Sequence, residues 1–114
     1  MNKKVIVTLY HADWCGYCVK LMPEWNIFEK SILNMKNNYN GIPIEIKEYE
    51  HAKLSKLGGG TINGIKITGY PTIKIKLISG KEEKEYDYEK YINKKKEKYM
   101  TNFIKNICNE LKKY

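Results

Sequence analysis

Trp14-Cys15-Gly16-Tyr17-Cys18 decides the fold, because it places two thiols where a strand pattern gives way to a helical one. The preceding residues 5–10 (VIVTLY) are β-branched and aromatic, which is typical of a buried strand. Apolar residues at helical spacing follow the motif: Tyr17, Leu21, Trp25, Phe28 and Ile32. We therefore expect Cys15 at the N-terminus of a helix, with Cys18 one turn inside it.

This position has chemical consequences for the two cysteines. The first N–H groups of a helix lack intrahelical partners and carry partial positive charge, which stabilises a thiolate. Such sites lower a cysteine pKa from about 8.5 to roughly 3.5–7.5, and a thiolate attacks disulfides. Cys18 shares the face of Cys15 and is placed to attack the resulting mixed disulfide. The pattern predicts a redox-active pair in which Cys15 is the nucleophile and Cys18 the resolving thiol.

Other readings of the cysteine pair have less support. Half a zinc site would need a second pair, yet Cys108 is the only other cysteine, and His11 and His51 lack zinc-finger spacing. No metal site is therefore expected. A structural disulfide across so short a loop would remove little chain entropy from the unfolded state. Two inert thiols remain the third alternative.

Length and composition bound the class of protein. A chain of 114 residues with 42% hydrophobic content suits a single domain, spanning 1–114. No stretch is apolar enough to cross a bilayer, so no membrane association is expected. The strand pattern begins almost at Met1, without a signal-peptide pattern, and this favours the cytoplasm, where a Cys-x-x-Cys is more often catalytic than structural.

The charge balance argues against nucleic-acid recognition. The formal net charge is +8, and all 21 basic residues are lysine. Frequent Lys, Asn, Ile and Tyr are typical of an AT-rich genome, for which a large DNA virus or a parasite is a candidate source. Because base and phosphate recognition favours arginine, we interpret the lysines as a solvated surface that adds weak, salt-sensitive attraction to acidic partners.

The chain divides into alternating elements. Residues 4–10 are apolar on both faces and predict a central strand. A helix over 15–36 contains Pro23, where a kink is expected, and Asp13 is its candidate cap. After a turn over 37–41, a strand over 42–49 reads as a sheet edge, parallel to the first.

The second half is less regular at its start. Residues 51–57 suggest a short helix, 58–60 a glycine break and 63–64 a turn, after which Ile65 and Ile67 return to the core. An antiparallel hairpin follows, with strands over 72–78 and 83–88. The last helix covers 88–111. Its apolar stripe contains Met100, Phe103, Ile104, Ile107, Cys108 and Leu111, so Cys108 is expected to be buried.

This order of elements, together with Trp-Cys-Gly-x-Cys, resembles the thioredoxin fold and its relatives. Pro23 matches the family's kink proline, Pro71 its cis-proline facing the motif, and Gly80 its hairpin turn; residues 69–74 (GYPTIK) look most like protein disulfide isomerase domains. The resemblance implies an α/β class and a minimal thioredoxin-like fold. That fold is a four-stranded mixed sheet packed by helices, in the order β-α-β-α-β-β-α.

Three departures from the family pattern stand out. Too few residues precede Cys15 for the strand and helix that begin a full thioredoxin, so the core should have glutaredoxin length. Leu9 occupies the position of the family's buried acid, and water, His11 or Tyr17 would then have to deprotonate the resolving thiol. Tyr17 before Cys18 is similar to glutaredoxins and some bacterial isomerases, although the glutaredoxin double glycine is missing.

The resemblance implies a thiol–disulfide oxidoreductase that needs no cofactor. Its partners would be protein disulfides and a thiol reductant or oxidase, and it would act as a monomer. Substrate would meet the apolar side chain of Trp14, the open backbone at Gly16, Tyr17, the backbone of Tyr70 and cis-Pro71. Tyr17 either hydrogen-bonds a thiolate or is simply exposed. His11 is a candidate proton shuttle, with packing at the strand end as its alternative.

Two other functions stay open. A glutaredoxin-like protein would use glutathione or hold an iron–sulfur cluster between two subunits. A redox-inactive binding module would keep the fold without the chemistry.

Overall fold

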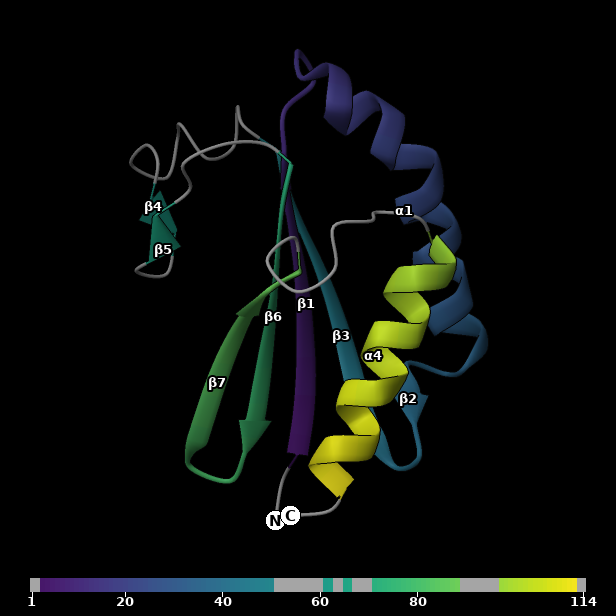
Figure 1. Ribbon diagram of the computed structural model, residues 1–114, viewed down its shortest axis with the longest axis vertical. Coiled ribbons are helices and arrows are strands. Elements are labelled where there is room, and N and C mark those ends of the chain that lie inside the picture. The colour runs from purple at the N-terminus through teal and green to yellow at the C-terminus, as the bar shows by residue number, and fades with distance from the viewer. Residues whose placement is uncertain (1–2, 51–60, 63–64, 67–70, 89–96, 113–114) are drawn as a thin grey trace.

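A mixed sheet of five strands carries the fold, in the spatial order β2-β3-β1-β6-β7. The computed structural model of the protein describes residues 3–50, 61–62, 65–66, 71–88 and 97–112. The strands of the sheet are β1 (Lys3–His11), β2 (Asn38–Tyr39), β3 (Ile42–Glu50), β6 (Thr72–Ser79) and β7 (Glu82–Asp87) (Figure 1). The α/β class is confirmed, with one strand more than the four expected.

Strand β1 lies at the centre of the sheet, as its two apolar faces predict. It pairs in parallel with β3, with Val5 opposite Ile44, and antiparallel with β6, where Tyr10 lies opposite Thr72. Strands β6 and β7 form the expected antiparallel hairpin, and Gly80 in its turn has a positive φ of 62°. The parallel pairing of β1 and β3 brings their carboxyl ends to the same edge of the sheet.

Two short pairings were missed by the sequence analysis. Residues 37–41 were expected to form only a turn, but Asn38 and Tyr39 form β2 and pair with the start of β3. The Asn38 side chain accepts a hydrogen bond from the Gly41 N–H at 2.9 Å, which closes the reversal between the two strands. A separate two-stranded sheet pairs β4 (Thr61–Ile62) with β5 (Ile65–Lys66).

Several expectations fall where the structure gives no description. The short helix over 51–57, the glycines at 58–60, the turn at 63–64 and the return of Ile67 to the core all lie outside the described residues. Ile65 lies in β5, whereas the burial of its side chain is not described.

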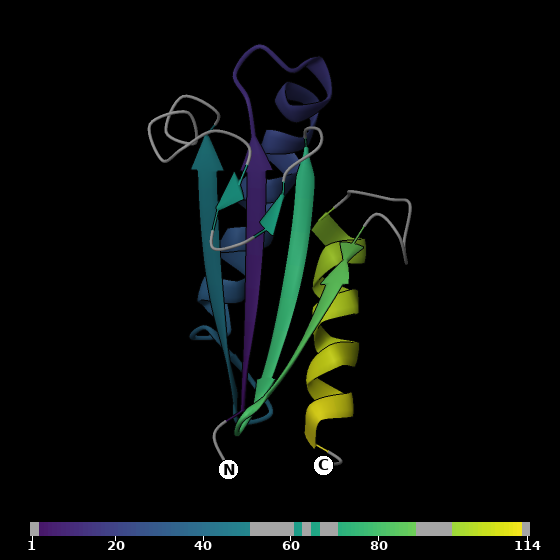
Figure 2. The same ribbon diagram turned by 90° about the vertical axis from the view of Figure 1, so that its left-hand side faces the viewer.

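Both described helices cover the same face of the main sheet, while β4 and β5 lie on the other side (Figures 1 and 2). Helix α1 (Gly16–Asn34) contains Pro23, and α4 (Glu97–Lys112) ends the chain. Helix α1 stops before the expected residue 36 because Lys36 and Asn37 adopt positive φ angles of 60° and 53°. The expected first part of the last helix falls on residues 89–96, outside the described residues.

The core lies between the two helices and the covered face of the sheet. Helix α1 buries Cys18, Leu21, Trp25, Phe28 and Ile32. Tyr17 was expected in this stripe, but it is 76% exposed: Tyr17 and Cys18 flank the two sides of the stripe, and the fold buries the Cys18 side. Helix α4 buries Met100, Ile104, Ile107 and Cys108, as predicted. Within the described residues, no helix combines the length and apolarity that a membrane crossing requires.

The burial pattern of α1 predicts that substitutions at neighbouring positions have very different effects on the free energy of unfolding. Phe28 is fully buried, whereas Ile27 is 50% exposed. We expect Phe28→Ala to lower the free energy of unfolding by about 3–5 kcal/mol, because it leaves a cavity under the helix. Ile27→Ala is the matched control, for which we expect a change within about 0.5 kcal/mol. Urea unfolding followed by circular dichroism measures both, and equal losses would contradict the assigned face of the helix.

Candidate functional site

The turn between β1 and α1 builds the site. The Cys15 N–H donates to the Ala12 carbonyl oxygen at 3.1 Å, which folds the chain back at the end of the strand. Cys15 then serves as N-cap with extended backbone angles, and the Cys18 N–H donates to Cys15 Sγ at 3.2 Å. The expected position of both cysteines is confirmed. The expected cap, Asp13, is wrong, because the turn leaves it outside the helix, where its N–H donates to Glu50 Oε1 at 3.3 Å.

The two thiols differ in their access to solvent. Together with Ala12 they form a small buried cluster separate from the main core. Cys15 is 8% exposed and Cys18 only 1% exposed. The sulfur of Cys15 also receives the hydrogen bond from the helix N-terminus, an arrangement that favours negative charge on that atom. Cys15 is therefore the thiol better placed to meet a substrate first.

The surface around the thiols is open and aromatic. Trp14 and Tyr17 are 70% and 76% exposed, so Tyr17 takes the exposed alternative. A Cβ built on Gly16 would meet no atom within 4 Å, which leaves free space beside Cys15. A flat substrate segment could approach this surface without moving the protein backbone.

Pro71 lies at the same end of the sheet as the thiols. It is buried, and it directly precedes β6, whose first residue Thr72 pairs with Tyr10 near the end of β1. Tyr70 lies outside the described residues, so the cis form of the Tyr70–Pro71 bond and the substrate contact of the Tyr70 backbone stay predictions.

His11 also occupies this end of the sheet. It is 8% exposed, and its Nε2 lies 3.5 Å from Glu48 Oε2 on β3. The sequence analysis missed Glu48, although a signal was present. Ile42, Ile44 and Ile46 alternate on the covered face of β3, and Glu48 continues that alternation with an acid.

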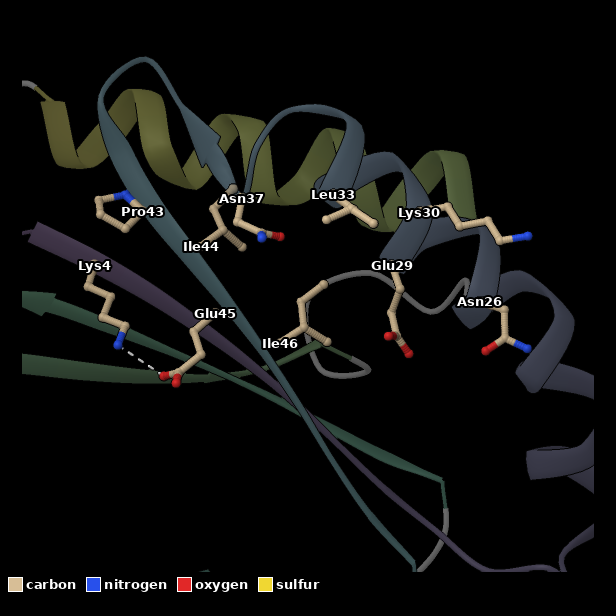
Figure 3. Close-up of a pocket in the computed structure, with 10 residues that line it drawn as sticks. All are labelled: Lys4, Asn26, Glu29, Lys30, Leu33, Asn37, Pro43, Ile44, Glu45 and Ile46. Carbon is tan, nitrogen blue, oxygen red and sulfur yellow. Dashed lines mark ion pairs between the residues drawn. The ribbon is translucent and has the colours of Figure 1, made fainter.

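A second acid, Glu29 on α1, lies close to Glu48. Burial raises the pKa of the Glu29 carboxyl, the charge of Glu48 raises it further, and the neighbouring Trp25 side chain partly opposes both. Glu29 projects into a groove of about 770 Å³ between α1 and the edge of β3, together with Ile46 and Asn26 (Figure 3). This groove runs along the flank of the fold and does not include the thiols.

The third cysteine is chemically distinct. Cys108 is fully buried in the main core, and burial raises the pKa of its thiol to about 11. Among the residues that the structure describes, no three His, Cys, Asp or Glu side chains gather into a group that could hold a metal ion.

These environments predict selective alkylation of the reduced protein. Iodoacetamide at pH 7 should modify Cys15 and leave Cys108 intact, because Cys108 is both buried and protonated at that pH. Peptide mass mapping after short exposure measures the order of labelling. Cys15→Ser is the control that should remove the first adduct, and modification of Cys108 in the folded protein would contradict the assigned environments.

The raised pKa of Glu29 predicts a pH-dependent effect on stability. A carboxyl whose pKa is higher in the folded state destabilises the fold above that pKa, and the penalty disappears as the pH falls through it. Glu29→Gln should therefore raise the free energy of unfolding more at pH 7 than at pH 4. Urea unfolding at both pH values measures this, with exposed Glu82→Gln as the control expected to show no such difference. An equal effect at both pH values would contradict the assignment.

Comparison with known proteins agrees with this geometry. The chain matches the thioredoxin family over residues 1–106. Protein disulfide-isomerase A4 of Bos taurus is 32% identical over 89 residues, covering 77% of this chain and 12% of that protein. The protein disulfide-isomerase of Ricinus communis is 35% identical over 81 residues, covering 71% of this chain and 15% of that protein. The chain thus spans less than a sixth of the length of either isomerase.

Solved structures show the same fold. The Trx4 domain of ERdj5 superposes with a TM-score of 0.61 at 19% identity, covering 92% of this chain and 80% of that one. Human ERp44 in its zinc-bound form gives a TM-score of 0.61 at 20% identity, covering 90% of this chain and 26% of that one. With the family match extending over nearly the whole sequence, the chain belongs to the thioredoxin family.

Proposed function

We propose that this protein is a thiol–disulfide oxidoreductase that acts on protein disulfides through Cys15 and Cys18. The observation that carries the proposal is the hydrogen bond from the Cys18 N–H to Cys15 Sγ at the start of α1. It supports a thiolate at the more exposed sulfur, with a second thiol held beside it. Relatives named protein disulfide-isomerase support the same class of chemistry.

The proposed reaction has two steps. Cys15 thiolate attacks one sulfur of a substrate disulfide, forms a mixed disulfide and releases the first substrate thiolate. Cys18 then loses its proton and attacks Cys15 Sγ, which forms the Cys15–Cys18 disulfide and releases the second substrate thiolate. The substrate gains two electrons and two protons, and the two cysteines are oxidised. A thiol reductant restores the pair, and an oxidase partner would drive the same steps in reverse.

The substrate would be held by the surface around Cys15. The exposed rings of Trp14 and Tyr17 provide apolar contact, and the open space at Gly16 admits an extended chain. The segment at Tyr70 and Pro71, at the start of β6, would pair with the backbone of that chain. Such contacts recognise the shape of an unfolded segment more than its sequence, which suits a general protein substrate.

Reduction of insulin disulfides by the protein with dithiothreitol tests the activity. Wild-type protein should accelerate precipitation of the insulin B chain above the dithiothreitol background. Cys15→Ser should return the rate to that background, because the remaining thiols of Cys18 and Cys108 are buried away from the substrate. Cys108→Ser is the matched control and should retain full activity. A wild-type protein indistinguishable from dithiothreitol alone would contradict the proposal.

The order of the two steps has a separate test. Cys18→Ser should accumulate a mixed disulfide between Cys15 and substrate, because the resolving thiol is missing. Non-reducing electrophoresis and mass mapping identify this adduct. Trapping through Cys18 in a Cys15→Ser variant, with none through Cys15, would reverse the assigned roles.

A further inference from the structure

The buried position of Cys18 raises a question that the two-step scheme leaves open. Cys18 must lose a proton before it can attack the mixed disulfide, yet it is only 1% exposed. A thiol so far from water needs a neighbouring group that takes the proton and passes it to solvent. The covered face of β1 below this point is apolar, with Val5, Val7 and Leu9 buried.

His11 is the titratable side chain that β1 places nearest to the cysteine turn. It precedes Ala12, whose carbonyl oxygen binds the Cys15 N–H and which shares the buried cluster of both thiols. The His11 side chain is 10% exposed, and its buried Nε2 makes no aligned hydrogen bond within the described part of the chain. The carboxylate oxygen Oε2 of Glu48 nevertheless lies 3.5 Å from that nitrogen.

Glu48 connects this histidine to the solvent. Its side chain is 39% exposed at the edge of the sheet. Among the residues that the structure describes, the other titratable groups near this end include Glu50 on β3, which accepts the Asp13 N–H, Cys15 in the turn, and Glu29 and Cys18 on α1. Burial and the charge of Glu48 raise the pKa of Glu29, which lines the groove of Figure 3.

We propose that His11 and Glu48 form a proton relay that serves Cys18. This inference rests on the proposed oxidoreductase function. Neutral His11 carries its proton on Nε2, toward Glu48, and Nδ1 accepts the proton of Cys18 as that sulfur attacks Cys15 Sγ. The substrate thiolate leaves and is protonated, while the imidazolium returns its proton through Glu48 to water. One S–S bond forms as another breaks, and protons and electrons balance.

Reaction with Ellman's reagent tests the relay separately from the first step, because each of the two cysteines releases one equivalent of thionitrobenzoate in its own phase. Attack by Cys15 releases the first thionitrobenzoate and leaves a mixed disulfide, and attack by Cys18 releases the second. His11→Gln should slow the second phase by about 100-fold or more, as expected for loss of a general base. The first phase should stay within about twofold of wild type, since the relay does not act on Cys15.

A matched pair of acids sharpens the test. Glu48 and Glu45 lie on the same strand, and the side chains of both are 39% exposed, but Glu45 pairs with Lys4. Glu48→Gln should slow the second phase, whereas Glu45→Gln should leave both phases unchanged. Because Glu48 is a partly exposed edge residue, its variant should fold even if His11→Gln does not. Added imidazole should restore the second phase of His11→Ala, which a purely structural role would not allow.

The outcomes are distinguishable. An unchanged second phase in both His11→Gln and Glu48→Gln would overturn the relay while leaving the oxidoreductase proposal intact. Equal slowing in Glu48→Gln and Glu45→Gln would also overturn it, because the effect would then follow from lost charge alone. A wild-type protein that releases only one equivalent would contradict the proposed function, and the relay with it.

Discussion

The hydrogen bond from the Cys18 N–H to Cys15 Sγ is the interaction on which the site depends. It exists only because the chain reverses between Ala12 and Cys15, so that a buried strand ends one turn before a helix begins. A neutral hydrogen bond contributes about 0.5–1.5 kcal/mol, and one to an ionised acceptor contributes more. The same contact therefore caps the helix when the sulfur is a thiol and stabilises the charge when it is a thiolate.

The rest of the fold holds that turn in place. Strand β1 is central in its sheet and carries fully buried side chains, such as Val5 and Leu9, against helix α1. The start of α1 cannot shift relative to the end of β1 without opening this core. Trp25 and Phe28, further along the same helix, are fully buried in it. Reactive groups held on packed strands and helices keep their geometry better than groups on loops. Glu29 on α1 and Glu48 on β3 are positioned by the packing of the same helix against the same sheet.

Much of the fold follows directly from local pattern in the sequence. The alternation in 72–78 and the spacing of Leu21 and Trp25 are local patterns that report which side chains are buried. Gly80 is a local signal of a turn, because glycine adopts a positive φ readily. The dithiol could be located for the same reason, because its motif and its helix are contiguous. Strand β2 could not, since its two residues, Asn38 and Tyr39, form a strand only by pairing with the strand that follows.

The acids beside His11 show why other parts of the site escape sequence reasoning. Glu29 and Glu48 are distant in the chain and meet only when α1 packs against β3, so their mutual effect on pKa is a property of tertiary structure. His11 was recognised as titratable, but its partner depends on the register between β1 and β3. The cap was misassigned to Asp13 because the turn after β1 continues to Cys15, two residues further along the chain.

Equilibration with glutathione redox buffers tests the central claim most directly, with the Cys15–Cys18 couple quantified by mass spectrometry after acid quenching. The account predicts a reversible internal disulfide with a midpoint between about −270 and −120 mV, the range of dithiol oxidoreductases. It also predicts that Cys108 stays reduced throughout, because it is buried in the main core. Two cysteines that form only separate glutathione adducts, or no disulfide at any ratio of reduced to oxidised glutathione, would contradict the account.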